Sequence, residues 1–143
     1  MKVTATGILI TLLTITVQAA HCAERVSSAK FPICPDSPNC VNSLQHEKRH
    51  AIAPISFQGS QKEAIRKAAS ALQLMGGEVT IQENVIHAVF TSAIFGFKDD
   101  VHVMPDQKVQ VLHVRSASRT GYYDFGVNRK RIEELRELIL LSN

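Results

Sequence analysis

The residues best suited to chemistry lie near the end of the sequence, in a stretch from Val114 to Arg131. Five basic side chains occur between Arg115 and Arg131, with Asp124 as the one acid among them. Because guanidinium groups and the amides of a helix N-terminus both bind oxyanions, this composition predicts a site for phosphate, sulfate, a carboxylate or a lipid head group. The candidate anion-binding residues are Arg115, Ser116, Ser118, Arg119, Asn128 and Arg129.

A structural interpretation of the same stretch needs no ligand. In it, three aspartates form ion pairs with the nearby arginines and fix the long loop to a sheet, while the two serines cap turns. The candidate ion-pair residues are Asp99, Asp100 and Asp124.

Catalytic chemistry has weaker support in these patterns. Ser116 and Ser118 lack the Gly-x-Ser-x-Gly setting of a nucleophile elbow. The adjacent aspartates at positions 99 and 100 point to opposite faces of a strand, so they cannot act there as a paired acid and base. His102 and His113 are expected to face each other across a hairpin, where they could form a metal or acid–base pair. We assign no catalytic residue, no metal ligand and no cofactor.

Cys34 and Cys40 bracket a short loop that contains Pro35 and Pro38 together with residues that favour turns. In an oxidising compartment, thiols this close are expected to pair if the loop brings their Cα atoms within about 7 Å. A redox pair or a metal site is the alternative. The spacing is not Cys-x-x-Cys, and no second cysteine pair or histidine pair of metal-binding spacing follows.

The N-terminus has the organisation of a cleavable secretory signal over residues 1–22. Lys2 precedes an uncharged run from Ile8 to Val17, and small residues follow at the distance of a cleavage site after Ala19 or after Cys22. We therefore expect an exported protein, periplasmic or secreted.

Two alternatives to cleavage stay open. A retained membrane anchor would have to span the bilayer with a short uncharged stretch that contains several threonines. A lipoprotein would be modified at Cys22, although the bulky His21 stands where lipid attachment requires a small residue.

Length and charge limit the function classes. The chain has 143 residues, enough for one domain with a core, and its formal net charge of +3 is too small for a nucleic-acid footprint. The partner is unknown from composition. An anionic small molecule, a lipid head group or an envelope protein would fit an exported domain.

Hydrophobic periodicity predicts an α+β two-layer sandwich over residues 51–143, after a loop-rich segment over residues 23–50. A helix is expected from Ser60, which opens a capping box, to Met75, and a closing helix from about Asn128, its expected N-cap. Alternation predicts an antiparallel sheet of about four to five strands, covered on one face by both helices. The expected strand ranges are 51–57, 78–82, 85–95, 100–104 and 108–115, with a turn at Pro105 and Asp106.

Four blocks of sequence resemble the signatures of a bacterial and plant family catalogued as domain of unknown function 1499. They begin at Cys34, Phe95, Val114 and Gly121 and read CPDSPNCVNS, FGFKDDV, VRSASR and GYYDFGVNRKRI. The resemblance covers residues 31–141. It implies that the polar blocks belong to one pattern, but it supplies no substrate.

Three functions follow as hypotheses. The first is a non-catalytic exported domain that binds an anionic ligand or head group. The second is a structural or assembly factor that docks a protein partner through the loop from Tyr122 to Phe125. The third is a small hydrolase that uses the same polar cluster.

Overall fold

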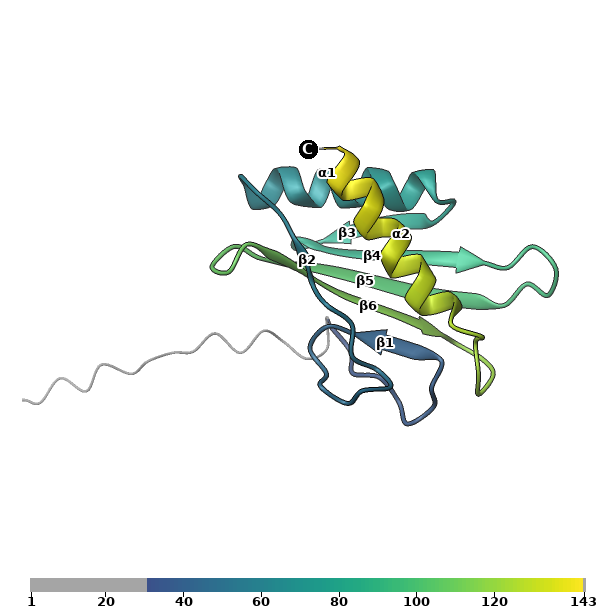
Figure 1. Cartoon of the computed structure of the whole chain (residues 1–143). Coiled ribbons are helices and arrows are strands. Elements are labelled where there is room, and N and C mark those ends of the chain that lie inside the picture. The colour runs from purple at the N-terminus through teal and green to yellow at the C-terminus, as the bar shows by residue number, and fades with distance from the viewer. Residues whose placement is uncertain (1–30, 143) are drawn as a thin grey trace, which may run out of the picture.

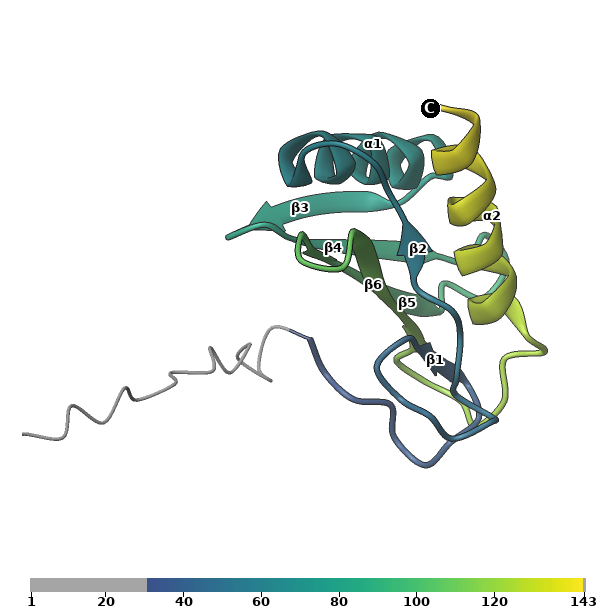
Figure 2. The same cartoon turned by 60° about the vertical axis from the view of Figure 1, so that its left-hand side comes forward.

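The chain folds into a two-layer α+β sandwich, with both helices on the same face of an antiparallel sheet (Figures 1 and 2). A computed structural model of the protein describes residues 31–142. The elements in chain order are β1 (Cys40–Asn42), β2 (Ile55–Ser56), α1 (Gln61–Leu74), β3 (Glu78–Gln82), β4 (Val85–Thr91), β5 (Lys98–Asp106), β6 (Val111–Ser118) and α2 (Val127–Leu141).

The sheet has the strand order β1-β6-β5-β4-β3. Strand β2 also pairs with β6, nearer to the start of β6 than β1 does. The four strands β3 to β6 are joined by consecutive antiparallel hairpins. The expected fold class and meander are therefore confirmed. Strand β3 forms one edge of the sheet, whereas β6 is flanked on its other side by the two short N-terminal strands.

Helix α1 begins where the sequence predicted. The Ser60 side chain accepts a hydrogen bond from the Glu63 amide at 3.2 Å, which satisfies one of the free N–H groups of the first turn. Ala68 and Leu72 are fully buried on one side of the helix. Gly76 follows the C-terminus with a φ of +89°, a conformation that glycine adopts without strain.

The core lies between the helices and the face of the sheet that they cover. Ile86, Val101 and Val114 are fully buried on three neighbouring strands, and Leu135 of α2 packs into the same cluster. Each such side chain contributes about 1.5–3 kcal/mol by its transfer out of water. These alternating apolar positions fix which face of each strand is covered.

One strand was not predicted, and two predictions about strands and turns were wrong. The segment expected to be loop-rich contributes strand β1, in which Val41 pairs with Ser116 of β6. The strand expected over residues 51–57 is reduced to Ile55–Ser56, because Pro54 has no N–H to donate to a ladder. No turn occurs at Pro105, which pairs with a residue of β6 inside the sheet.

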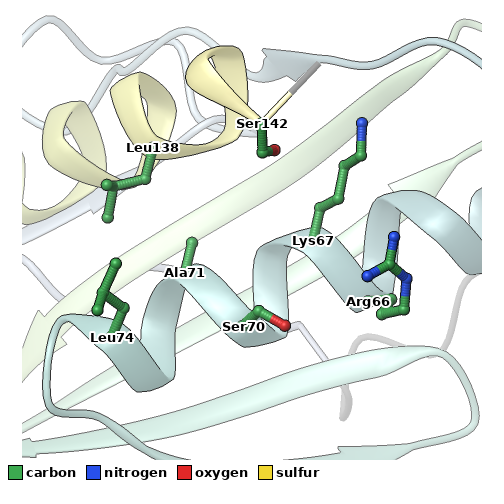
Figure 3. A pocket seen from close by; sticks show the side chains of 7 residues that line it. All are labelled: Arg66, Lys67, Ser70, Ala71, Leu74, Leu138 and Ser142. Atoms are coloured by element: carbon green, nitrogen blue, oxygen red, sulfur yellow. The ribbon is translucent and has the colours of Figure 1, made fainter.

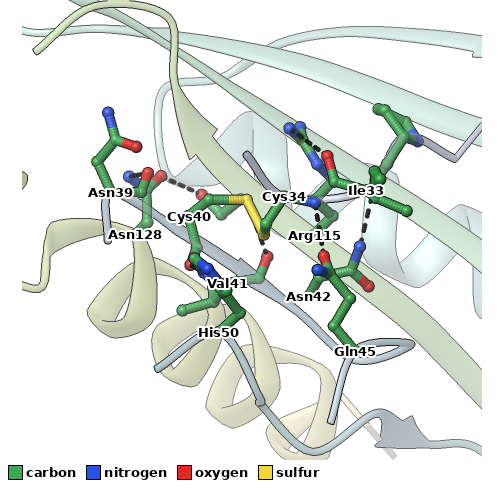
Figure 4. The surroundings of a disulfide bond; sticks show 12 residues. Ile33, Cys34, Asn39, Cys40, Val41, Asn42, Gln45, His50, Arg115 and Asn128 are labelled. Atoms are coloured by element: carbon green, nitrogen blue, oxygen red, sulfur yellow. Dashed lines mark hydrogen bonds between the residues drawn. A yellow bond between two sulfur atoms is a disulfide. The ribbon is translucent and has the colours of Figure 1, made fainter. Parts of the chain in front are cut away.

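The expected disulfide joins Cys34 and Cys40, whose Cα atoms are 5.6 Å apart (Figure 4). Both cysteines are buried and form a small cluster with Ala117 of β6. The His50 ring lies within 2.9 Å of the Cys40 carbonyl, and the Cys34 amide donates to the Gln45 side chain. The disulfide thus anchors the N-terminal segment to the edge of the sheet.

Reduction of this disulfide should lower the free energy of unfolding by about 2 kcal/mol, because a short closed loop restrains the unfolded chain only modestly. Urea unfolding with and without reductant measures the difference. The Cys34→Ser/Cys40→Ser double variant should unfold like the reduced protein. Identical curves for the oxidised and reduced protein would refute the stabilising role of the bond.

Candidate functional site

The predicted anion-binding residues do not converge on one site, because they lie on both faces of the sheet. Ser116 and Ser118 point to the face that the helices cover, and Asn128 of α2 meets them there. Arg115 lies between them in β6, so its side chain points to the opposite face. Because side chains alternate between the two faces of β6, the predicted cluster is divided into two groups, one on each face of the sheet.

Asn128 is the centre of the group on the helix-covered face and is fully buried. Its Oδ1 accepts a hydrogen bond from the Ser116 hydroxyl at 2.6 Å. Its Nδ2 donates to the Asn39 carbonyl at 3.0 Å, to the Ser118 hydroxyl at 3.0 Å and to Asp124 at 2.9 Å. One side chain thus connects α2 to β6 and to the residue before β1.

The prediction that Asn128 is the N-cap of α2 was wrong. Gly126 is the N-cap, with a φ of +78°, and it offers no side chain. The Asp124 carboxylate takes over the capping, since it accepts hydrogen bonds from the amides of Gly126 at 3.0 Å and Asn128 at 2.9 Å. Asn128 lies within the first turn, so its side chain turns toward the sheet instead.

Arg131 completes this group, although the sequence did not single it out. Its guanidinium donates to Asp99 at 2.6 Å and to the Asn128 side chain at 2.8 Å. It also lies over the Phe90 ring, 4.7 Å from the centroid. Position 131 is one helical turn after position 128, and that i, i+3 spacing is the signal that could have identified it. Because its members satisfy one another, this group joins the helix to the sheet.

The opposite face of the sheet carries a second polar group around Asp100. Both oxygens of this carboxylate accept hydrogen bonds from Arg119 at 2.8 Å, and the His87 ring lies at 2.7 Å. The hydrogen bonds from Arg119, together with His87, lower the pKa of Asp100 to about 2 against the opposing effect of burial. Arg119 is thereby committed to an internal ion pair.

Arg115 lies beside this group but has no carboxylate partner among the described residues. It is buried, and its Nη2 donates to the Ile33 carbonyl at 3.4 Å (Figure 4). Burial lowers the pKa of the Arg115 guanidinium. Arg129 lies elsewhere, on α2, and donates to the Arg49 carbonyl at 3.4 Å. The two arginines therefore do not belong to one site.

The expected facing pair of His102 and His113 is wrong. His102 pairs in register with Arg115 on one side and with His87 on the other, whereas His113 lies opposite Met104. The rings of His87 and His102 stack with centroids 4.8 Å apart. The strand register is offset by two residues from the expected one because β5 continues to Asp106, so the turn lies at residues 107–110 and not at Pro105 and Asp106.

Burial lowers the pKa of His102 to about 4, and the nearby positive charges of His87 and Arg115 act in the same direction, while Asp100 opposes them. The folded protein therefore holds His102 neutral at a pH where the unfolded chain binds a proton. The contribution of neutral His102 to the free energy of unfolding is fully present above the ordinary histidine pKa of 6.5. It is lost as the pH falls toward 4.

The free energy of unfolding, measured with urea at several values between pH 7 and pH 4.5, should therefore decrease with acidity. In the His102→Gln variant this decrease should be smaller, since a neutral side chain replaces the one that must stay unprotonated. The Asp100 ion pair is lost only below this pH range, because the ordinary pKa of the Asp100 carboxyl is 3.8. An unchanged slope in the variant would contradict the assignment.

The chemistry available to these groups is limited. The His87 ring is oriented by a carboxylate, as in many general bases, yet among the described residues no hydroxyl or thiol is hydrogen-bonded to it. Ser43 Oγ lies 3.4 Å from His113 Nδ1, but among the described residues no carboxylate is hydrogen-bonded to His113 to orient its ring. Within residues 31–142, no group of three or more potential ligands could hold a metal ion.

Exposed apolar side chains gather at the end of the sheet where these polar groups lie. The loop between β4 and β5 and the loop between β6 and α2 are neighbours there, since the Arg119 amide donates to the Lys98 carbonyl at 2.9 Å (Figure 1). Each loop carries three large side chains that are 55–84% exposed: Ile94, Phe95 and Phe97 in the first, Tyr122, Tyr123 and Phe125 in the second. We call these six residues the aromatic tip.

Two features describe the conformation of the aromatic tip. Phe95 stacks on Phe97 with ring centroids 5.5 Å apart, and Tyr123 meets Phe125 edge-on at 5.2 Å. The backbone of Phe125 has a φ of +54°, a left-handed conformation that is costly for a bulky residue. The fold accepts this strain at a side chain that is 83% exposed, so packing in the core is not its reason.

A groove of about 270 Å³ lies between the helices, away from the aromatic tip (Figure 3). Its apolar lining comes from Ala71, Leu74 and Leu138. Arg66 and Lys67 extend beside it from α1. None of the predicted site residues lines this groove. No helix within residues 31–142 is long and apolar enough to cross a membrane.

The fold and these contacts define a small single-sheet α+β domain whose internal polar groups hold an exposed aromatic end. The chain belongs to the family described as Protein of unknown function (DUF1499), whose model matches residues 30–139. This match confirms the resemblance of the four sequence blocks. No match was found among curated proteins or among solved structures.

Proposed function

We propose that this protein is a non-catalytic exported module that docks onto an anionic lipid surface through the aromatic tip. The observation that carries the proposal is the gathering of six large, exposed apolar side chains on two adjacent loops. A domain of this kind rarely leaves so many large apolar residues together in water unless they bind something. Aromatic side chains are also favoured where a protein surface meets lipid head groups.

The charges near the tip favour an anionic surface. The three carboxylates of these segments are all engaged internally: Asp99 with Arg131, Asp100 with Arg119, and Asp124 with the amides of α2. Lys98 at the base of one loop and Lys130 in the first turn of α2 remain exposed. Each basic residue near an anionic membrane contributes about 1 kcal/mol to binding.

The shape of the tip favours lipid over a folded protein partner. The apolar side chains project from loops at the end of the sheet, whereas the groove between the helices lies beside α1. A projecting set of side chains needs a complementary hollow in a protein partner, but it enters a lipid interface without one. Docking to an envelope protein is therefore the alternative that the test must separate.

Export is part of this proposal. The Cys34–Cys40 disulfide supports it, since such bonds persist mainly in oxidising compartments. The signal expected over residues 1–22 lies outside the described residues.

Co-sedimentation with lipid vesicles tests the proposal. The purified protein should bind vesicles that contain phosphatidylglycerol, bind pure phosphatidylcholine vesicles several-fold more weakly, and lose affinity as the salt concentration rises. The Lys98→Glu/Lys130→Glu variant should bind the anionic vesicles more weakly than the parent. The absence of binding to either vesicle type would refute lipid docking and leave the protein partner as the remaining candidate.

A further inference from the structure

We infer that two copies of this chain pair through the β3 edge and form one continuous antiparallel sheet. Strand β3 is the outermost strand beside β4, and no other strand of the described residues pairs with its outer side. Its sequence, EVTIQ, contains no proline or lysine, and its register with β4 has no bulge. Prolines, lysines and bulges are features with which proteins normally block an exposed strand edge, and β3 has none of them.

The hairpin geometry shows which backbone groups face outward. Glu83 and Asn84 both have positive φ values, of 45° and 70°, as in the two-residue turn that joins tightly paired strands. Gln82 and Val85 flank the turn and form its hydrogen-bonded pair. Because bonded pairs alternate along an antiparallel ladder, the amides and carbonyls of the two intervening β3 residues, Val79 and Ile81, point away from β4.

Strand β3 is complementary to β3 of a second copy when the two strands run antiparallel. With Thr80 on a two-fold axis, Val79 lies opposite Ile81 of the second copy, and the outward groups of each can form four hydrogen bonds between the copies. Glu78 then lies opposite Gln82 of the second copy, so no like charges meet. Two threonines face each other at the axis, which is a favourable cross-strand pair.

The side chains beside the edge also need a cover. Ile81 is 51% exposed, although it lies on the face that the helices protect. It borders a groove of about 600 Å³ between α1 and β3, to which Ile65 and Ala69 contribute apolar surface. In the paired sheet, Val79 of the second copy is the direct neighbour of Ile81 and covers it. The strand that covers Ile81 at the β3 edge therefore comes from a second copy of this chain.

Light scattering after gel filtration tests this inference on the intact chain. The protein should have twice the mass of one chain, and Ile81→Lys should reduce this to a single mass, since it places a charged side chain against the apolar Val79 of the second copy. Gln82→Lys, which adds the same charge opposite Glu78 of the second copy, should keep the dimer. A single mass for the parent protein, or a dimer that persists in Ile81→Lys, would overturn the inference.

A cysteine substitution fixes the register. Across the two-fold axis the Cα atoms at position 80 should be about 4.5 Å apart, within the range that a disulfide spans. Mild oxidation should therefore cross-link Thr80→Cys into covalent dimers but leave Gln82→Cys uncrosslinked, since position 82 does not meet itself. Both variants carry the same native cysteines, so any background is equal. Equal cross-linking of the two variants would rule out this register.

Discussion

Replacing Asn128 by alanine should lower the free energy of unfolding by about 3–5 kcal/mol. The side chain is fully buried and hydrogen-bonds to Ser116, Ser118, Asp124 and Arg131, as well as to the carbonyl before β1. Its removal leaves several buried polar groups without a partner, and each such group costs about 1–3 kcal/mol. Urea unfolding monitored by circular dichroism measures the loss.

Glu134→Ala is the matched control for this experiment. Glu134 lies on the same helix but is exposed, so its replacement should change stability by less than about 0.5 kcal/mol. If Asn128→Ala is as stable as this control, the polar group on the helix-covered face does not hold α2 to the sheet.

The second large effect concerns lipid binding. The Phe95→Ser/Phe125→Ser double variant should bind anionic vesicles at least about 100-fold more weakly than the parent, because each aromatic side chain that enters the interface contributes about 1.5–3 kcal/mol. The two residues are 71% and 83% exposed, so the fold should tolerate both changes. Titration of vesicles into the protein, with sedimentation of the bound fraction, gives the ratio.

Val109→Ser provides the control at the opposite end of the sheet. Val109 lies in the turn between β5 and β6 and is 62% exposed, yet it is far along the hairpin from the aromatic tip. This variant should bind like the parent. Equal affinity of the double variant and Val109→Ser would mean that the aromatic tip does not contact lipid. All these proteins share one N-terminal segment, so their differences report the loops alone.

Much of the fold could be predicted from local patterns. The capping serine at position 60, the apolar face with Leu72 and the glycines after it define α1 without tertiary information. Strand alternation identified the meander and the face that the helices cover. Strand β1 was missed because it is three residues long and pairs with β6, more than 70 positions away. Such a strand depends on a partner that local propensity cannot reveal.

The site was harder to predict because it depends on register. Ser116 and Arg115 are neighbours in the sequence but lie on opposite faces of β6, so one predicted cluster became two. The facing of His87 and His102 required the exact alignment of β4 with β5. The structural interpretation expected all three aspartates to pair with arginines. Asp100 pairs with Arg119, but the partner of Asp99 is Arg131, and Asp124 caps α2 instead.

The aromatic tip was foreseen only in part, through the loop from Tyr122 to Phe125. Ile94 and Phe95 were assigned to a strand that was expected to run through residue 95, where alternation would have buried half of its side chains. The strand ends at Thr91, and the following residues form an exposed loop. The Gly96 between the two phenylalanines is the signal that marks a turn there.

The most direct test of lipid docking uses tryptophan fluorescence, because the native chain contains no tryptophan. Phe95→Trp places a single reporter in the aromatic tip, and Val109→Trp places one at the opposite end of the sheet. On addition of phosphatidylglycerol vesicles, the emission of Phe95→Trp should shift to shorter wavelength as the indole leaves water, while that of Val109→Trp should stay unchanged. An unshifted emission in Phe95→Trp, or an equal shift in both variants, would contradict docking through the aromatic tip.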